Sequence, residues 1–139
     1  MARKKPKRMW IYSPKKPTPP QVLDDLKAEV EAKGNELVEM YLEPMYIKPP
    51  PEDQRWNYII DLFTRSHRSF FYFCSTYACP GPNALSPTFE SRFARMEYVG
   101  SDRFNLAYMR HTEKWWQVAQ GLTAEEYLEM IRGGGIFQP

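Results

Sequence analysis

The chain has 139 residues, of which 42% are hydrophobic and 15% aromatic, which is enough to build the core of one folded domain. Its two cysteines are too few for a disulfide framework or a complete zinc site, and it lacks the run of about 18 apolar residues that spans a bilayer. Seven of the 19 basic residues lie in residues 1–16, which contain no acid. The other 12 basic and 17 acidic residues therefore give residues 17–139 a net charge of −5.

Residues 1–19 are predicted to form a basic, proline-rich arm outside the folded domain, because repeated prolines disfavour a helix and the lysines repel one another. Clustered lysine and arginine bind nucleic acid by releasing counterions, so the arm has an obvious class of partner. The acidic body argues against a dedicated nucleic-acid binder, and a solubilising tail is the alternative. The candidate nucleic-acid-binding residues are Arg3, Lys4, Lys5, Lys7 and Arg8.

The charges at the start of the arm are not followed by the apolar stretch of a secretory signal peptide. We therefore expect a cytoplasmic protein with reduced thiols and no membrane association.

The first helix is predicted over residues 20–43, with Thr18 available as its capping residue. Gly34 is its weak point, costing about 1 kcal/mol relative to alanine. Pro44 is expected to end the helix, and residues 43–54, with three consecutive prolines, to form an extended linker. The apolar residues recur at three- and four-residue steps and form one stripe, which consists of Leu23, Leu26, Val30, Leu37, Met40 and Tyr41.

The hydrophobic period then changes to two, which predicts a meander of about five antiparallel strands. Gly100 to Asp102 is a strong signal for a tight turn. A last helix follows, where Thr123 and Glu126 form a capping box and Gly133 to Gly135 provide the stop. The order helix, sheet, helix predicts an α+β two-layer sandwich as a single domain over residues 20–139. The predicted strands are residues 55–65, 70–78, 89–99, 103–111 and 115–120.

Both faces of the predicted sheet are apolar, whereas a sheet with one wet face shows clean alternation. We expect the two helices to cover one face, and the arm, the linker or a second subunit to cover the other. If the first hairpin pairs around Ser66 and His67, one face carries Trp56, Tyr58, Ile60, Leu62, Phe70, Tyr72 and Cys74. The other face then carries Ile59, Phe63, Phe71, Phe73 and Tyr77.

Weak catalytic candidates are Arg110, His111 and Asp61. His111 could act as a general base beside an anion-binding Arg110, although a strand end with a charged turn explains the same residues. Asp61 lies in an apolar strand, where a buried carboxylate needs a partner such as Arg92 or Arg95. A pocket with a shifted carboxyl pKa is the alternative interpretation of Asp61.

The remaining residues give no sign of a metal site or a cofactor. Cys74 and Cys79 are four residues apart, which fits neither a redox motif nor a zinc site, so we expect ordinary thiols. His67 lies in a predicted turn, and its spacing does not suggest a metal site. Neither a phosphate-binding glycine loop nor a serine-hydrolase elbow occurs in the sequence.

The segments "YFCSTYACPGPNALSPTFESRFARMEYVG", "DRFNLAYMRHTEKWWQ" and "LTAEEYLEMI" resemble a family of small bacterial proteins that is classified as a domain of unknown function. The resemblance runs from about Arg55 to the end, with a looser match earlier. It implies a bacterial cytosolic protein and brings no activity, cofactor or partner.

Three functions are consistent with the sequence. The first is a non-enzymatic interaction module that forms a homodimer through an aromatic sheet face. The second is a nucleic-acid-associated protein that uses the basic arm. The third is a small hydrolase-like enzyme built around Arg110, His111 and Asp61, which requires those side chains to converge in one cleft.

Overall fold

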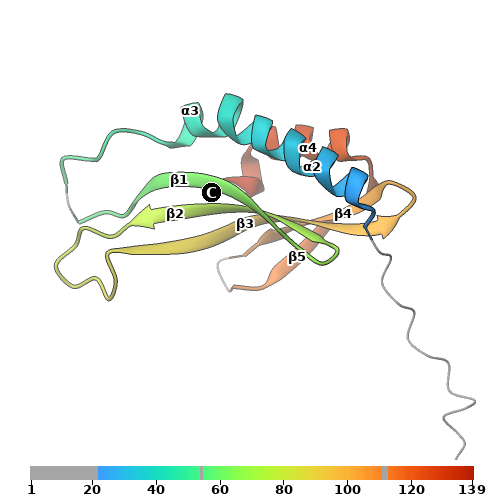
Figure 1. Ribbon diagram of the computed structural model, residues 1–139. Coiled ribbons are helices and arrows are strands. Elements are labelled where there is room, and N and C mark those ends of the chain that lie inside the picture. Colours follow the sequence, from blue (N-terminus) through green and yellow to red (C-terminus); the bar gives the residue numbers. More distant parts are fainter. Residues whose placement is uncertain (1–21, 54, 111–112) are drawn as a thin grey trace, which may run out of the picture.

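The computed structural model describes residues 22–53, 55–110 and 113–139, which form two layers. A five-stranded sheet makes one layer, and all the helices among the described residues lie on one side of it (Figure 1). The predicted α+β two-layer arrangement is therefore confirmed. The arm, residues 1–19, lies outside the described residues.

The strands follow one another in chain order across the sheet, and each pairs antiparallel with the next. The predicted meander is confirmed, with each predicted strand end within three residues of the observed one. Ser101 and Asp102 have φ angles of 53° and 57°, as the two-residue turn between β3 and β4 requires. The strands are β1 (Tyr58–His67), β2 (Phe70–Ala78), β3 (Thr88–Gly100), β4 (Arg103–Met109) and β5 (Trp115–Leu122).

Three helical segments run in succession before the sheet, namely α2 (Asp24–Leu37), the π-helix η1 (Val38–Leu42) and α3 (Glu43–Tyr46). The prediction that Pro44 ends the helix is wrong, because the helical backbone continues to Tyr46. A regular turn would bring the Pro44 ring against a carbonyl one turn earlier. The wider turn of η1 precedes the proline, and Pro44 stands in the first turn of the short α3.

The C-terminal helix α4 (Ala124–Arg132) begins as the sequence predicts. The Thr123 hydroxyl accepts a hydrogen bond from the Glu126 amide, and the Glu126 carboxylate accepts one from the Thr123 amide. Lys33 on α2 contacts Glu125 on α4 and lies 3.0 Å from Glu29, which joins the two helices at their outer surface. The short 3-10 helix η2 (Gly135–Phe137) completes the chain.

The hydrophobic core lies between the helices and the sheet. Val30, Leu37 and Leu42 come from the helical layer, and Tyr127 and Ile131 come from α4. Burying these side chains stabilises the fold by about 1.5–3 kcal/mol for each aliphatic or phenylalanine residue. The sheet contributes Leu62, Phe71, Phe73, Phe93, Ala94, Met96, Tyr98, Phe104 and Leu106.

The register of the first hairpin differs from the prediction and changes which residues share a face. His67 pairs with Phe70, so the loop consists of Arg68, with a φ of 56°, and Ser69. Moving the turn by one residue exchanges the faces of one strand relative to the other. Leu62 therefore joins Phe71 on the helix side, instead of lying with Tyr72.

An irregularity between Ile59 and Asp61 changes the faces again within β1. Ile59 packs against the core, whereas Ile60 is exposed. Such bulges cannot be located from a period-two pattern, because they add one residue to one strand only.

Candidate functional site

The face of the sheet that points away from the helices is covered by arginine side chains. Tyr72 and Cys74 alternate with the core residues of β2, so they point to this helix-free side. Both are nevertheless buried, with 7% and 1% of their surface exposed. The centre of this face therefore needs no cover from the arm, the linker or a second subunit.

Two arginines of β3 contribute to that cover, together with the rings of Phe70 and Trp115 beside Tyr72. The Arg92 guanidinium lies 4.4 Å from the centre of the Tyr72 ring. The Arg95 guanidinium lies between two rings, 4.8 Å from Phe70 and 4.9 Å from Trp115. Each such contact contributes about 0.5–1 kcal/mol at an exposed site and about 2 kcal/mol when it is desolvated.

A third arginine extends the same surface to the edge strand β1. Arg65 stacks on Phe63 at 5.3 Å, and its guanidinium lies 3.3 Å from the Glu90 carboxylate. We call this surface the arginine–aromatic face, and it consists of Phe63, Arg65, Phe70, Tyr72, Arg92, Arg95 and Trp115.

A stacked guanidinium can still bind a ligand. Stacking uses the flat face of the group and leaves the N–H donors along its edge free to point outward. The buried Arg95 Nε has no hydrogen-bond partner among the described residues. An unpaired buried donor is costly, and an anionic or carbonyl oxygen would relieve that cost.

The charges of the body are divided between its two layers. The four helical segments α2, η1, α3 and α4 hold ten acidic and three basic residues, whereas the five strands hold three acidic and four basic residues. The net charge of −5 that the sequence assigns to the body is thus a property of the helical layer. The arginine–aromatic face lies on the other side of the molecule.

The Cys74 thiol lies beneath this arginine cover. Burial raises its pKa to about 11, and the nearby Arg65 and Arg92 oppose that rise. At pH 8 a pKa of 11 leaves roughly 200-fold less thiolate than the ordinary cysteine value does. Cys79 is only partly buried, and both cysteines are free thiols, as the sequence predicts.

Alkylation at pH 8 should therefore modify Cys79 and spare Cys74 in the native protein at concentrations where it is monomeric, and modify both after unfolding, as measured by mass spectrometry. The Cys79→Ser variant is the control, and it should react only when it is unfolded. Because the folded pKa of Cys74 is raised, the unfolded chain ionises first, and this contribution to stability is lost as the pH rises from about 8.5 to 11. Rapid native labelling of Cys74 would show that its thiol ionises more readily than a pKa of about 11 allows.

Asp61 and Arg110, two of the three catalytic candidates, lie far apart in the described structure. Asp61 is exposed on β1, where it pairs with Thr76, and the described residues contain no ion pair between Asp61 and either Arg92 or Arg95. Arg110 follows β4, three strands away, which is about 14 Å. Its guanidinium stacks on Trp116 at 4.4 Å.

Several other candidates fall outside the described residues. These are His111 and the arm residues Arg3, Lys4, Lys5, Lys7 and Arg8. Within the described ranges, no group of three or more histidines, cysteines and acids is arranged to hold a metal ion.

The sequence predicts Arg92 or Arg95 as a partner for the Asp61 carboxylate, and this prediction is wrong. Both guanidinium groups lie on aromatic rings instead. The sequence does contain a signal for these contacts, because β2 carries aromatic residues at alternate positions and the next strand, β3, carries two arginines. That signal becomes useful only when the register is known, because the register decides which ring lies beside which arginine.

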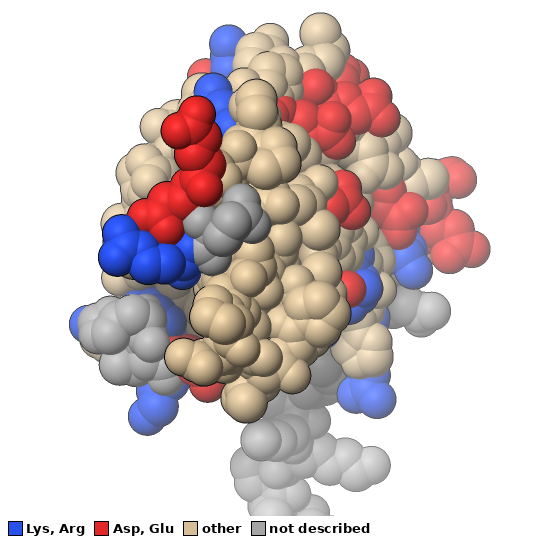
Figure 2. Space-filling model, turned by 90° about the vertical axis from the view of Figure 1, so that its left-hand side faces the viewer, with Lys and Arg blue, Asp and Glu red and all other residues tan. Residues whose placement is uncertain are grey.

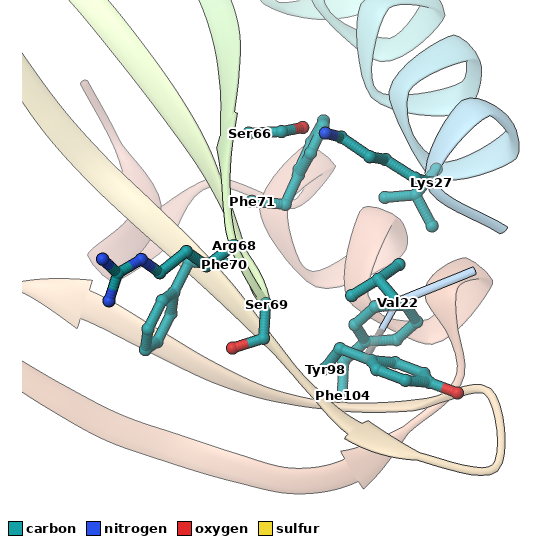
Figure 3. A pocket seen from close by; sticks show the side chains of 10 residues that line it. Val22, Lys27, Ser66, Arg68, Ser69, Phe70, Phe71, Tyr98 and Phe104 are labelled. Carbon is teal, nitrogen blue, oxygen red and sulfur yellow. The ribbon is translucent and has the colours of Figure 1, made fainter. Parts of the chain in front are cut away.

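The hollow beneath the N-terminal end of α2 is a gap in the core rather than a ligand site. Val22, Phe71, Tyr98 and Phe104 meet there, and Phe70 points away on the other side of the strand (Figure 3). Its cavity of about 20 Å³ has room for little more than one water molecule.

No helix among the described residues is both long and apolar enough to cross a membrane.

Residues 23–139 match the family model of a domain of unknown function, DUF3024. No curated protein and no solved structure shows significant similarity to the chain. The match spans α2, the whole sheet and α4, so it includes the arginine–aromatic face and leaves out the basic arm. The chain belongs to the DUF3024 family.

Proposed function

We propose that the protein is a binding module whose arginine–aromatic face holds single-stranded nucleic acid. The observation that carries this proposal is the stacking of arginines on aromatic rings across a sheet face that no described helix covers. Proteins that bind single strands combine positive charge, which follows the phosphates, with rings on which bases stack. This face supplies both kinds of group.

The partly exposed rings provide the positions for stacking. Phe63, Phe70 and Trp115 are half-buried, so each keeps accessible ring surface. Stacking of one base on such a ring contributes about 1–3 kcal/mol. Arg95 lies between the rings of Phe70 and Trp115, and Arg92 lies on Tyr72 beside them, so their outer N–H groups would face the phosphates of the same strand.

The division of charge supports the same face. The acidic helical layer would repel a polyanion, and the sheet side would not. The objection that the body is acidic therefore applies mainly to the helices, because the acids of the strands, Asp61, Glu90 and Glu97, are matched in number by Arg65, Arg92 and Arg95 on the same face. The basic arm adds seven positive charges in residues 1–16, which would strengthen binding to any nucleic acid in a salt-dependent way.

The enzyme hypothesis has less support, because Asp61 and Arg110 lie three strands apart. Self-association through the aromatic face also has less support than the sequence suggested. The rings at the centre of that face are already covered by arginines of the same chain, so a second copy would bury little additional apolar surface there.

The test is fluorescence anisotropy of a labelled single-stranded oligonucleotide, titrated with the full-length protein at several salt concentrations. Arg92→Gln with Arg95→Gln should weaken binding at least about tenfold and reduce the salt slope by about 1.4, since each lost phosphate contact removes about 0.7. Arg132→Gln is the matched control, because Arg132 also stacks on a tyrosine, Tyr41, but lies in the helical layer.

A second pair of variants tests the rings separately from the charge. Trp115→Leu should weaken binding by about 1–3 kcal/mol if a base stacks there. Its neighbour Trp116 pairs with Tyr108 and points to the other side of the sheet, so Trp116→Leu should leave the affinity unchanged. Equal effects of the two tryptophan variants, or an arginine pair without effect, would overturn the proposal.

A further inference from the structure

One end of the molecule carries exposed apolar side chains, and charged residues lie only at its rim. It is formed where β1 begins, β2 ends and β3 begins, and residues 70–89 contain no charged residue. Leu85 is 105% exposed and Trp56 is 63% exposed there, and Ile60 and Phe89 are exposed as well. Figure 2 looks onto this end, where uncharged residues fill the centre of the view and charged groups lie toward the rim. We call it the uncharged end.

The loop between β2 and β3 holds Leu85 in this exposed position. The Cys79 amide donates to the Pro87 carbonyl at 2.8 Å, and the Ser86 hydroxyl donates to the Thr88 carbonyl at 2.8 Å. Beneath the loop, the rings of Tyr77 and Phe89 stack at 5.0 Å. Burying a leucine side chain stabilises a protein by roughly 1.5–3 kcal/mol, and the exposed Leu85 does not contribute this free energy.

The opposite edge of this surface is also held in place. The Asp53 carboxylate accepts hydrogen bonds from the Arg55 amide at 2.9 Å and from the Arg55 guanidinium at 2.7, 3.0 and 3.1 Å, which fixes the chain next to Trp56. The ion pair neutralises the charges of Asp53 and Arg55 at this rim. An apolar centre with a polar rim is the usual composition of a protein interface.

A hollow lies directly beside the projecting leucine. Its volume is about 310 Å³, and its walls include Asn57, Cys79, Thr88 and Phe89. Leu85 itself forms part of the rim. A projection and a hollow in one patch are self-complementary, because a two-fold axis places each projection in the hollow of the other copy.

We propose that the uncharged end binds a second copy of this chain and forms a symmetric dimer in which each Leu85 enters the hollow of its partner. The projecting Leu85 and the adjacent hollow favour a second copy as the occupant, and the charges of the molecule are compatible with it. The acidic helical layers of two copies repel each other, and contact through the uncharged end keeps those layers apart. This inference does not depend on nucleic-acid binding, since the arginine–aromatic face is built from other residues.

Sedimentation equilibrium of the full-length protein over a range of concentrations tests the dimer. The wild type should approach twice the chain mass of 16.5 kDa, and Leu85→Glu should remain a monomer, with the dissociation constant raised at least about 100-fold by a buried charge. Leu23→Glu is the control, because Leu23 is also highly exposed but lies before α2, and it should dimerise like the wild type.

Phe89→Glu provides a second variant from the wall of the hollow and should also be a monomer. Circular dichroism and the melting temperature at low concentration show that the variants are folded. A wild type that stays monomeric at every concentration would overturn the inference, and so would a dimer that Leu85→Glu leaves intact. Oligonucleotide binding by the Leu85→Glu monomer separates this result from the proposed function.

Discussion

Replacing Tyr127 with alanine is expected to lower the free energy of unfolding by about 3–5 kcal/mol, whereas phenylalanine at the same position should raise it by about 1 kcal/mol. The Tyr127 ring is fully buried in the core, where it meets Phe104 edge-on at 5.7 Å. Alanine removes these contacts and leaves a cavity. The Tyr127 hydroxyl has no hydrogen-bond partner among the described residues, so phenylalanine removes only an unsatisfied polar group.

Urea unfolding of the wild type, Tyr127→Ala and Tyr127→Phe measures both changes in the free energy of unfolding. Their opposite signs separate the contribution of the ring from that of its hydroxyl. Burial, with a smaller effect of Glu97, raises the pKa of Tyr127. The unfolded chain therefore releases this phenol proton first, and the wild type should lose stability above about pH 10 more steeply than Tyr127→Phe does. A phenylalanine variant that is less stable than the wild type by more than about 1 kcal/mol would show that the hydroxyl is satisfied.

Replacing Gly34 with alanine should destabilise the protein, although helix propensity alone predicts a gain of about 1 kcal/mol. A Cβ atom at Gly34 would lie 2.8 Å from both Cε1 and Cζ of Phe71. That ring is buried and meets Phe73 edge-on at 5.5 Å, so it has little room to move. Overpacking costs about 1–3 kcal/mol, which exceeds the gain in propensity, and the larger Gly34→Val should cost more.

Two further variants separate packing from propensity. Ala28→Gly changes an exposed residue of the same helix and should cost only the propensity difference of about 1 kcal/mol. Phe71→Leu removes the obstructing ring, so Gly34→Ala should be less harmful in that background. A double-mutant cycle of thermal unfolding measures the coupling between Gly34→Ala and Phe71→Leu. The double variant should be more stable than the sum of the two single effects predicts. Strictly additive effects would mean that the Gly34 backbone and the Phe71 ring do not compete for space.

The contrast at Gly34 shows what the sequence could and could not predict. The pattern of apolar residues predicted the helices, the five strands and the capping box of Thr123, because each of these depends on neighbours within one turn or one strand. The role of Gly34 depends on Phe71, which is far along the chain, and only the packed layers bring the two together.

The same limit explains the arginine–aromatic face. The sequence showed that two arginines and several rings were present, but their contacts depend on a turn at Arg68 and on bulges in β1 and β3. A shift of one residue in that turn exchanged Leu62 and Phe63 between the two faces of the sheet. The surface could therefore not be assembled from the sequence, although its residues were known.

The cover over Tyr72 and Cys74 consists of side chains, and this determines how quickly it can be removed. Two arginine tails can change rotamer in picoseconds to nanoseconds at an exposed site, whereas lifting a helix off a sheet takes microseconds or longer. Access to the middle of β2 thus requires no movement of the backbone. A ligand that offers its own aromatic planes and anions could exchange places with the guanidinium groups one at a time, so its arrival need not wait for any part of the domain to open.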